Sequence, residues 1–157
     1  MPNDLGVGTG TITTDGTLLY VAGNGNFKSF NPVTKAWINL PLPTITLDGA
    51  GGLSYYDGVI YAHEGNGNGF AKFNISTRVW QNLVPLPDHA VLGSAIDPIR
   101  KRYYAYGMNG SSYFYEYDIA ANVWNVLNFT LFLFFDGGMV HVPTSGFEGI
   151  YFIQGIS

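Results

Sequence analysis

The chain contains no cysteine among its 157 residues. Disulfide bonds, thiolate metal sites and a cysteine nucleophile are therefore excluded. Charged residues are also scarce: they make up 11% of the chain, against roughly 25% in a typical soluble domain. Seven residues are basic and the formal net charge is −4. So few cations cannot neutralise a row of phosphates, and we expect no nucleic-acid partner.

Long hydrophobic runs are missing as well. The longest nearly unbroken apolar stretch is residues 126–135, whereas a membrane-spanning helix needs about 20 residues. The N-terminal residues have no basic segment followed by an apolar one, so the sequence shows no secretory signal. No window has a helical period of 3.6 residues with capping residues, and we expect no helix.

Glycine and aromatic residues are abundant: the chain has 21 glycines, and 16% of its residues are aromatic. Its three tryptophans, Trp37, Trp80 and Trp124, are evenly spaced and end the same phrase. In this phrase an aromatic residue precedes Asn or Asp, and the tryptophan follows that polar residue six positions later. The phrase occurs as FKSFNPVTKAW, FAKFNISTRVW and FYEYDIAANVW, with Asn31, Asn74 and Asp118 as its polar residues. The chain therefore contains an internal repeat.

Each repeat is expected to form four short antiparallel strands joined by turns of Gly, Asn, Asp or Pro. In the second repeat the expected strands are Gly52–Tyr56, Val59–His63, Phe70–Asn74 and Val79–Leu83. Four such strands in a repeat of about 40–50 residues are typical of a β-propeller blade.

The repeated phrase, preceded by a strand that ends in glycine, resembles the kelch repeat, including that of the galactose oxidase family. Kelch units carry a Gly-Gly doublet after the second strand, where this chain has the single glycines Gly23, Gly65, Gly107 and Gly155. The resemblance covers about three and a half repeats and implies an all-β fold of kelch-like propeller blades that form an incomplete ring. It implies one propeller segment, 1–157, with approximate blades 8–43, 49–87, 92–129 and a partial blade 136–157.

We expect the repeated residues to be structural. Trp37, Trp80 and Trp124 should occupy equivalent, largely buried positions between neighbouring blades. The polar residues of the phrase should hold the following turn by side-chain hydrogen bonds to the backbone; they are Asn31, Asn74 and Asp118.

Catalytic and metal-binding patterns are absent from the sequence. It contains neither G-x-S-x-G nor H-E-x-x-H, and the glycine string 65–69 links two expected strands rather than opening a helix. The histidines His63, His89 and His141 fall in three different repeats, which disfavours a shared metal site. The copper chemistry of galactose oxidase needs a cysteine-crosslinked tyrosine and is excluded here. We expect no catalytic residue, cofactor or metal.

Topology predicts one rim that is rich in loops. Connections in an antiparallel blade alternate between its two ends, so the loops 23–26, 64–69 and 107–112 share a rim with the crossings between blades. In the third crossing, residues 131–135 are all apolar, which indicates a contact with another chain or an absent part of this one. The last expected strand, 150–153, is an apolar sheet edge. The candidate binding and interface residues are Asn66, Asn68, His89, Asn109, Phe132, Phe134 and Phe152.

These features favour a non-catalytic binding and assembly module. Its loop-rich rim would bind a protein or a glycan, and a protein partner or a second copy would complete the ring. The composition suits an extracellular surface or virion-type assembly more than a cytoplasmic protein. The alternative is a sugar-active enzyme, because kelch-like propellers include sugar oxidases and mutarotases; it would need acid and base residues in the central channel.

Overall fold

The structure is a computed structural model that describes residues 10–47, 51–108, 112–127, 137–143 and 149–154. These residues form fourteen β-strands and no helix, as the sequence pattern predicts. The strands form three four-stranded sheets and one two-stranded sheet, and all pairs are antiparallel.

Each sheet contains strands that are consecutive in the chain. The first sheet consists of β1 (Thr11–Thr14), β2 (Leu19–Gly23), β3 (Asn26–Phe30) and β4 (Trp37–Asn39). The second consists of β5 (Gly52–Tyr56), β6 (Val59–His63), β7 (Phe70–Asn74) and β8 (Val79–Asn82). The third consists of β9 (Ala90–Asp97), β10 (Arg102–Met108), β11 (Ser112–Asp118) and β12 (Val123–Leu127). The fourth consists of β13 (Gly137–Val142) and β14 (Gly149–Gln154).

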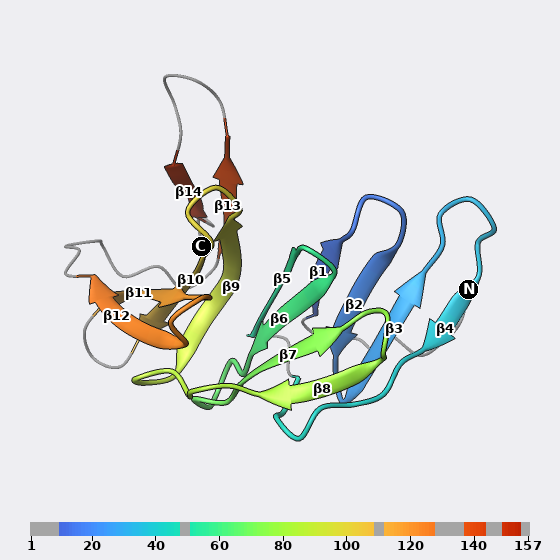
Figure 1. The fold of residues 1–157 in the computed structure, drawn as a ribbon, viewed down its shortest axis with the longest axis horizontal. Helices are drawn as coiled ribbons and strands as arrows, with labels where there is room; N and C mark the ends of the chain where they lie inside the picture. Colours follow the sequence, from blue (N-terminus) through green and yellow to red (C-terminus); the bar gives the residue numbers. More distant parts are fainter. Residues whose placement is uncertain (1–9, 48–50, 109–111, 128–136, 144–148, 155–157) are drawn as a thin grey trace.

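The sheets follow one another as the blades of an incomplete propeller-like fold (Figure 1). The first strand of each sheet packs against the first strand of the next, so β1, β5, β9 and β13 form the inner layer. The second sheet matches the expected strands, except that β8 ends at Asn82 instead of Leu83. Short antiparallel connections explain this agreement, because strand length and turn position are both local properties of the repeat.

The turns between third and fourth strands have the same geometry in all three complete sheets. Asn31 Oδ1 accepts hydrogen bonds from the Val33 and Thr34 backbones, and Asp118 Oδ1 accepts the equivalent pair from Ala120 and Ala121. In the second sheet, Asn74 Oδ1 accepts hydrogen bonds from the Thr77 backbone and the Ser76 hydroxyl. Each turn then contains one residue in the left-handed region: Lys35, Arg78 or Asn122.

The tryptophans occupy equivalent strand positions, opposite Phe30, Phe73 and Tyr117 of the preceding strand. They are half-buried, not largely buried as expected. All three are on the outermost strand of their sheet; Trp80 and Trp124 lie on the preceding blade, whereas Trp37 contacts Phe30 of its own sheet.

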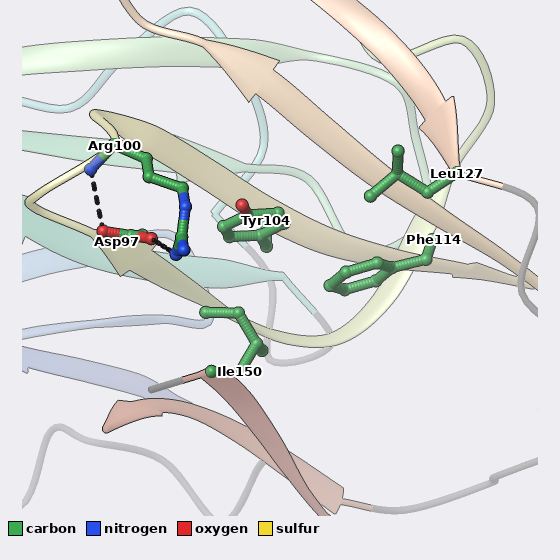
Figure 2. A pocket seen from close by; sticks show the side chains of 7 residues that line it. Asp97, Arg100, Tyr104, Phe114, Leu127 and Ile150 are labelled. Carbon is green, nitrogen blue, oxygen red and sulfur yellow. Dashed lines mark hydrogen bonds and ion pairs between the residues drawn. The ribbon is translucent and has the colours of Figure 1, made fainter. Parts of the chain in front are cut away.

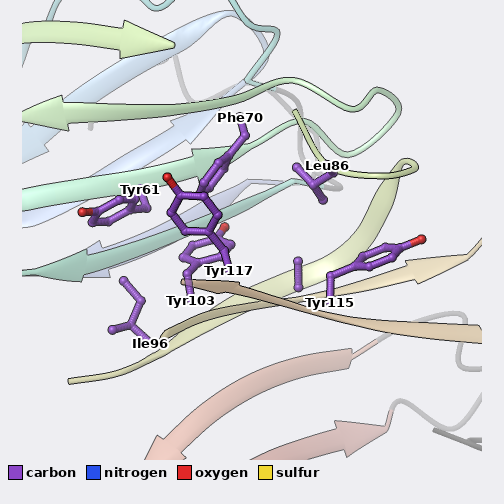
Figure 3. Close-up of a cluster of buried hydrophobic side chains, with 8 residues drawn as sticks. Tyr61, Phe70, Leu86, Ile96, Tyr103, Tyr115 and Tyr117 are labelled. Atoms are coloured by element: carbon purple, nitrogen blue, oxygen red, sulfur yellow. The ribbon is translucent and has the colours of Figure 1, made fainter. Parts of the chain in front are cut away.

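Two aromatic clusters form the core, one at each junction between complete sheets. The cluster between the second and third sheets is drawn in Figure 3; its buried members are Tyr61, Phe70, Leu86, Ile96, Tyr103, Ala105, Tyr115 and Tyr117. The cluster between the first and second sheets contains Tyr20, Ala22, Phe27, Leu47, Leu53, Ile60, Ala62 and Phe73. Each junction therefore buries side chains from two blades, which makes neighbouring blades interdependent.

Candidate functional site

The loop between β6 and β7, residues 64–69, is anchored by the carboxylate of its first residue. Glu64 Oε2 accepts a hydrogen bond from the Gly69 backbone at 2.9 Å, which closes the loop. Glu64 Oε1 accepts a second one from the Thr46 backbone, 2.6 Å away in the crossing that leaves the first sheet. One side chain therefore holds the loop closed and attaches it to the neighbouring blade.

Glycines leave room where the loop wraps around this carboxylate. A Cβ atom added at Gly67 would collide with Glu64 Oε2, and one at Gly69 would come within 2.6 Å of Glu64 Cδ. The glycine string thus leaves space for the half-buried carboxylate of Glu64. Asn66 and Asn68 alternate with these glycines and are exposed.

The crossing from the second to the third sheet lies beside this loop, because the Leu86 backbone donates to Asn68 O at 2.9 Å. Two residues further along, Asp88 Oδ1 accepts a hydrogen bond from the His89 backbone and lies 3.0 Å from His89 Nδ1. Both side chains are about one-third exposed, at 34% and 36%. We call Asn66, Asn68, Asp88 and His89 the rim site.

The other candidate residues fall elsewhere. Asn109, Phe132 and Phe134 lie outside the described residues. Phe152 belongs to β14, and its side chain is also outside the described part. Of the seven candidates, Asn66 and Asn68 lie in this loop, and His89 lies in the adjoining crossing, three residues beyond its backbone contact with the loop.

Polar side chains at the junction between the second and third sheets are bonded to one another. His63 Nδ1 and the Tyr103 hydroxyl are 2.6 Å apart, and the two residues are 1% and 0% exposed. The Ser54 and Ser94 hydroxyls are 2.8 Å apart across the same junction. Burial strongly raises the pKa of Tyr103, so its hydroxyl stays protonated even where an ordinary tyrosine would ionise. These bonds join the second and third sheets, and the His63–Tyr103 pair is buried.

A pocket of about 330 Å³ lies between the third sheet and β14 (Figure 2). Its apolar part is formed by Tyr104, Phe114, Leu127 and Ile150, with Gly149 beside them. The rings of Tyr104 and Phe114 are stacked with centroids 5.3 Å apart. We did not anticipate this pocket from the sequence, although the aromatic positions recur in every repeat.

Asp97 lies at the polar end of the pocket and is 1% exposed. Its Oδ1 accepts hydrogen bonds from the Ile99 and Arg100 backbones, and its Oδ2 pairs with the Arg100 guanidinium at 2.7 Å. His141 of β13 places Nε2 3.7 Å from Oδ1. Burial acts to raise the pKa of Asp97, but the Arg100 and Ile99 bonds and the His141 charge outweigh it, and the pKa is lowered.

Asp97→Asn should weaken the chain at neutral pH by about 1 kcal/mol, because the amide loses the ion pair with a half-exposed arginine. A depressed folded-state pKa contributes stability that is complete above the ordinary value of 3.8 and is lost as pH falls through the folded value. The difference in unfolding free energy between the two proteins should therefore shrink below about pH 4. Urea titrations at pH 7, 4 and 2.5 measure it. Asp57→Asn, at an exposed turn, is the control; a difference that is constant with pH would contradict the assignment.

Two absences hold for the described residues. They contain no cluster of three His, Asp or Glu side chains with the geometry to hold a metal ion. None of them belongs to a helix of the length and apolar character needed to cross a membrane.

Comparison with known proteins supports the fold. No protein-family model and no curated protein matches the sequence. Among solved structures, the one titled "Structure of YjhT" is similar with a TM-score of 0.65 at 13% identity, over 76% of this chain and 50% of that one. The chain thus spans about half the length of YjhT, a kelch-type propeller protein. Sequence repeat, sheet topology and this likeness agree that the chain has an incomplete propeller-like all-β fold.

Proposed function

We propose that the chain is a non-catalytic binding and assembly module of the kelch-like propeller type, which binds a protein or glycan at the rim site. The observation that carries the proposal is the Glu64 anchor. A carboxylate held by both Thr46 and Gly69 keeps the loop in one shape before any ligand arrives. A preorganised loop loses less conformational entropy on binding than a mobile one.

The chemistry of the rim site suits a polar ligand. The amides of Asn66 and Asn68 are each able to donate and accept hydrogen bonds, and both residues are exposed. The partly exposed Asp88–His89 pair adds a charged acceptor and an aromatic ring in the adjoining crossing. Amides and a carboxylate are common partners of hydroxyl and peptide groups.

The buried polar groups favour binding over the sugar-active alternative. A general acid or base must come within hydrogen-bond reach of the substrate. His63 and Tyr103 are buried and bonded to each other, and Asp97, at the polar end of the pocket, is held by the Arg100 guanidinium and two backbone hydrogen bonds. These groups support the packing of neighbouring blades, so we assign ligand recognition to the rim.

The proposal is tested with an array of immobilised glycans. We expect the full chain to bind a subset of glycans, and the double change Asn66→Ala with Asn68→Ala to reduce the signal at least about tenfold, as for residues central to an interface. Asn39→Ala, an exposed asparagine of β4 away from the rim site, is the matched control. Binding that survives the double change would contradict the rim site, and an array without any binding would contradict a glycan ligand.

The assembly part of the proposal includes the apolar residues Phe132, Phe134 and Phe152. They remain expected interface residues, since their side chains lie outside the described part of the chain. The test is the double change Phe132→Ser with Phe134→Ser, followed by light scattering and circular dichroism. Dissociation with the β signal intact would support an interface. Loss of the β signal itself would show that these residues cover the core of the protein.

A further inference from the structure

The junctions between complete sheets are built in the same way. Trp80 of β8 lies on Phe27 of the preceding sheet, with ring centroids 5.2 Å apart, and its Nε1 donates to Pro41 O at 2.8 Å. Trp124 of β12 lies on Phe70, at 4.9 Å, and its Nε1 donates to Val84 O at 3.0 Å. In both cases the tryptophan of one blade covers an aromatic surface of the blade before it.

That aromatic surface consists of a tyrosine from the second strand of the blade, a phenylalanine from or next to the third strand, and a leucine at the end of the fourth strand. The tyrosine and phenylalanine rings are stacked, with centroids 6.5 Å apart in the first sheet and 6.2 Å apart in the second. The three sets, matched by strand register and repeat spacing, are Tyr20, Phe27 and Leu40; Tyr61, Phe70 and Leu83; and Tyr104, Phe114 and Leu127. The third set is the wall of the pocket in Figure 2.

Burial shows that the third surface is covered less completely at its phenylalanine, while Tyr104 is buried like its equivalents and Leu127 is half-buried like Leu40 and Leu83. Phe27 and Phe70 are each 1% exposed, whereas Phe114 is half-buried. Ile150 of β14 occupies the position of Ile60 and Tyr103, which are both 0% exposed, and it is also half-buried. The first two surfaces are covered by third and fourth strands of the next blade, and the described part of the fourth sheet has only β13 and β14.

The edge of β14 provides the second half of the surface. β6 and β10 each pair with a strand on both sides, whereas within the described residues β14 pairs with β13 alone. A strand edge offers a row of backbone donors and acceptors to which an extended segment can add. An added third strand would continue the sheet, and a fourth strand would then reach the pocket.

We infer that the pocket and the edge of β14 form a docking site for a tryptophan-bearing antiparallel strand pair of a partner polypeptide. The two complete junctions define its chemistry: an aromatic residue, then Asn or Asp, with tryptophan six residues later on the returning strand. The tryptophan fills the space among Tyr104, Phe114, Leu127 and Ile150. This inference deepens the assembly part of the proposed function and is independent of the rim site.

The probe is a fluorescently labelled synthetic peptide with the sequence of residues 70–83, which contains the strand pair and Trp80. Fluorescence anisotropy with the full chain should show saturable binding. The same peptide with alanine in place of Trp80 should bind at least about tenfold more weakly, because a buried tryptophan is a typical hot spot. Equal binding of the two peptides, or binding of neither, would overturn the inference.

Protein variants locate the binding. Leu127→Lys places a charge in the pocket and should abolish peptide binding, while Val126→Lys, on the exposed side of the same strand, should leave it unchanged. Circular dichroism checks that both variants fold. If Leu127→Lys does not fold, the comparison between the peptide and its Trp80→Ala form still tests the inference. A stable dimer of the unmixed chain that Leu127→Lys dissociates would show that a second copy fills the pocket, which overturns the choice of partner.

The rim site provides the last comparison. The change Asn66→Ala with Asn68→Ala should leave peptide binding unaltered, and Leu127→Lys should leave glycan binding unaltered. Loss of only one of the two activities therefore tells which proposal fails. Peptide binding that is lost with the rim variant would contradict the pocket.

Discussion

Replacing Phe70 by alanine should lower the free energy of unfolding by about 3–5 kcal/mol. The ring is 1% exposed, and its centroid lies 5.0 Å from Tyr103, 4.8 Å from Tyr117 and 4.9 Å from Trp124. Its removal leaves a cavity that these large, interlocked rings cannot fill by small shifts. Because Phe70 lies at the junction of two blades, we also expect the third blade to separate from the second at lower denaturant concentration.

Urea unfolding followed by circular dichroism and tryptophan fluorescence measures this effect. Phe30→Ala is the matched control, since Phe30 is the same residue type, is half-buried and has Trp37 of its own sheet as its ring partner. The control should cost less than half as much as the change at Phe70. Equal costs would mean that the junction contributes no more than contacts within a blade.

The second large effect is expected at the tryptophans, and it should differ among them. Trp124→Ala and Trp80→Ala each remove a ring contact to the preceding blade. Each also removes a hydrogen bond to a backbone carbonyl in the crossing that follows that blade. We expect a cost of about 3 kcal/mol for each. Trp37→Ala should cost about half of that, because its ring contact within the described residues is to Phe30 alone.

Thermal and urea unfolding of the three variants would measure this order. A double-mutant cycle between Phe70 and Trp124 should give a coupling energy of about 0.5–1.5 kcal/mol, the range found for aromatic pairs. Three equal costs together with no coupling would contradict the assignment of Trp80 and Trp124 to the junctions.

Local features of this chain follow closely from its sequence. Strand positions could be predicted because each strand is short and bounded by turn residues, and because the same pattern occurs at every repeat. The Asn or Asp of the phrase could be connected to its turn, since a hydrogen bond to the backbone two or three residues away needs no partner from elsewhere. The repeat spacing also indicated the propeller-like architecture, which the likeness to YjhT supports.

Features that join blades could not be read in this way. The sequence marks Glu64 only as the residue before a glycine string, and its bond to Thr46 spans 18 residues and two sheets. Tyr104, Phe114 and Leu127 look like ordinary core residues, as their equivalents in the first two blades are. Their exposure to a pocket depends on which strands of the next blade lie against them.

Sequence alone therefore determined the repeat, the strands, their turns and the all-β class, because each depends on residues within a few positions of one another. The tertiary structure decided that the tryptophans are half-buried, that the rim loop is anchored to its neighbour, and that the third blade presents a pocket beside β14. The burial of a side chain depends on what packs against it, and in a propeller the packing surface belongs to the adjacent blade.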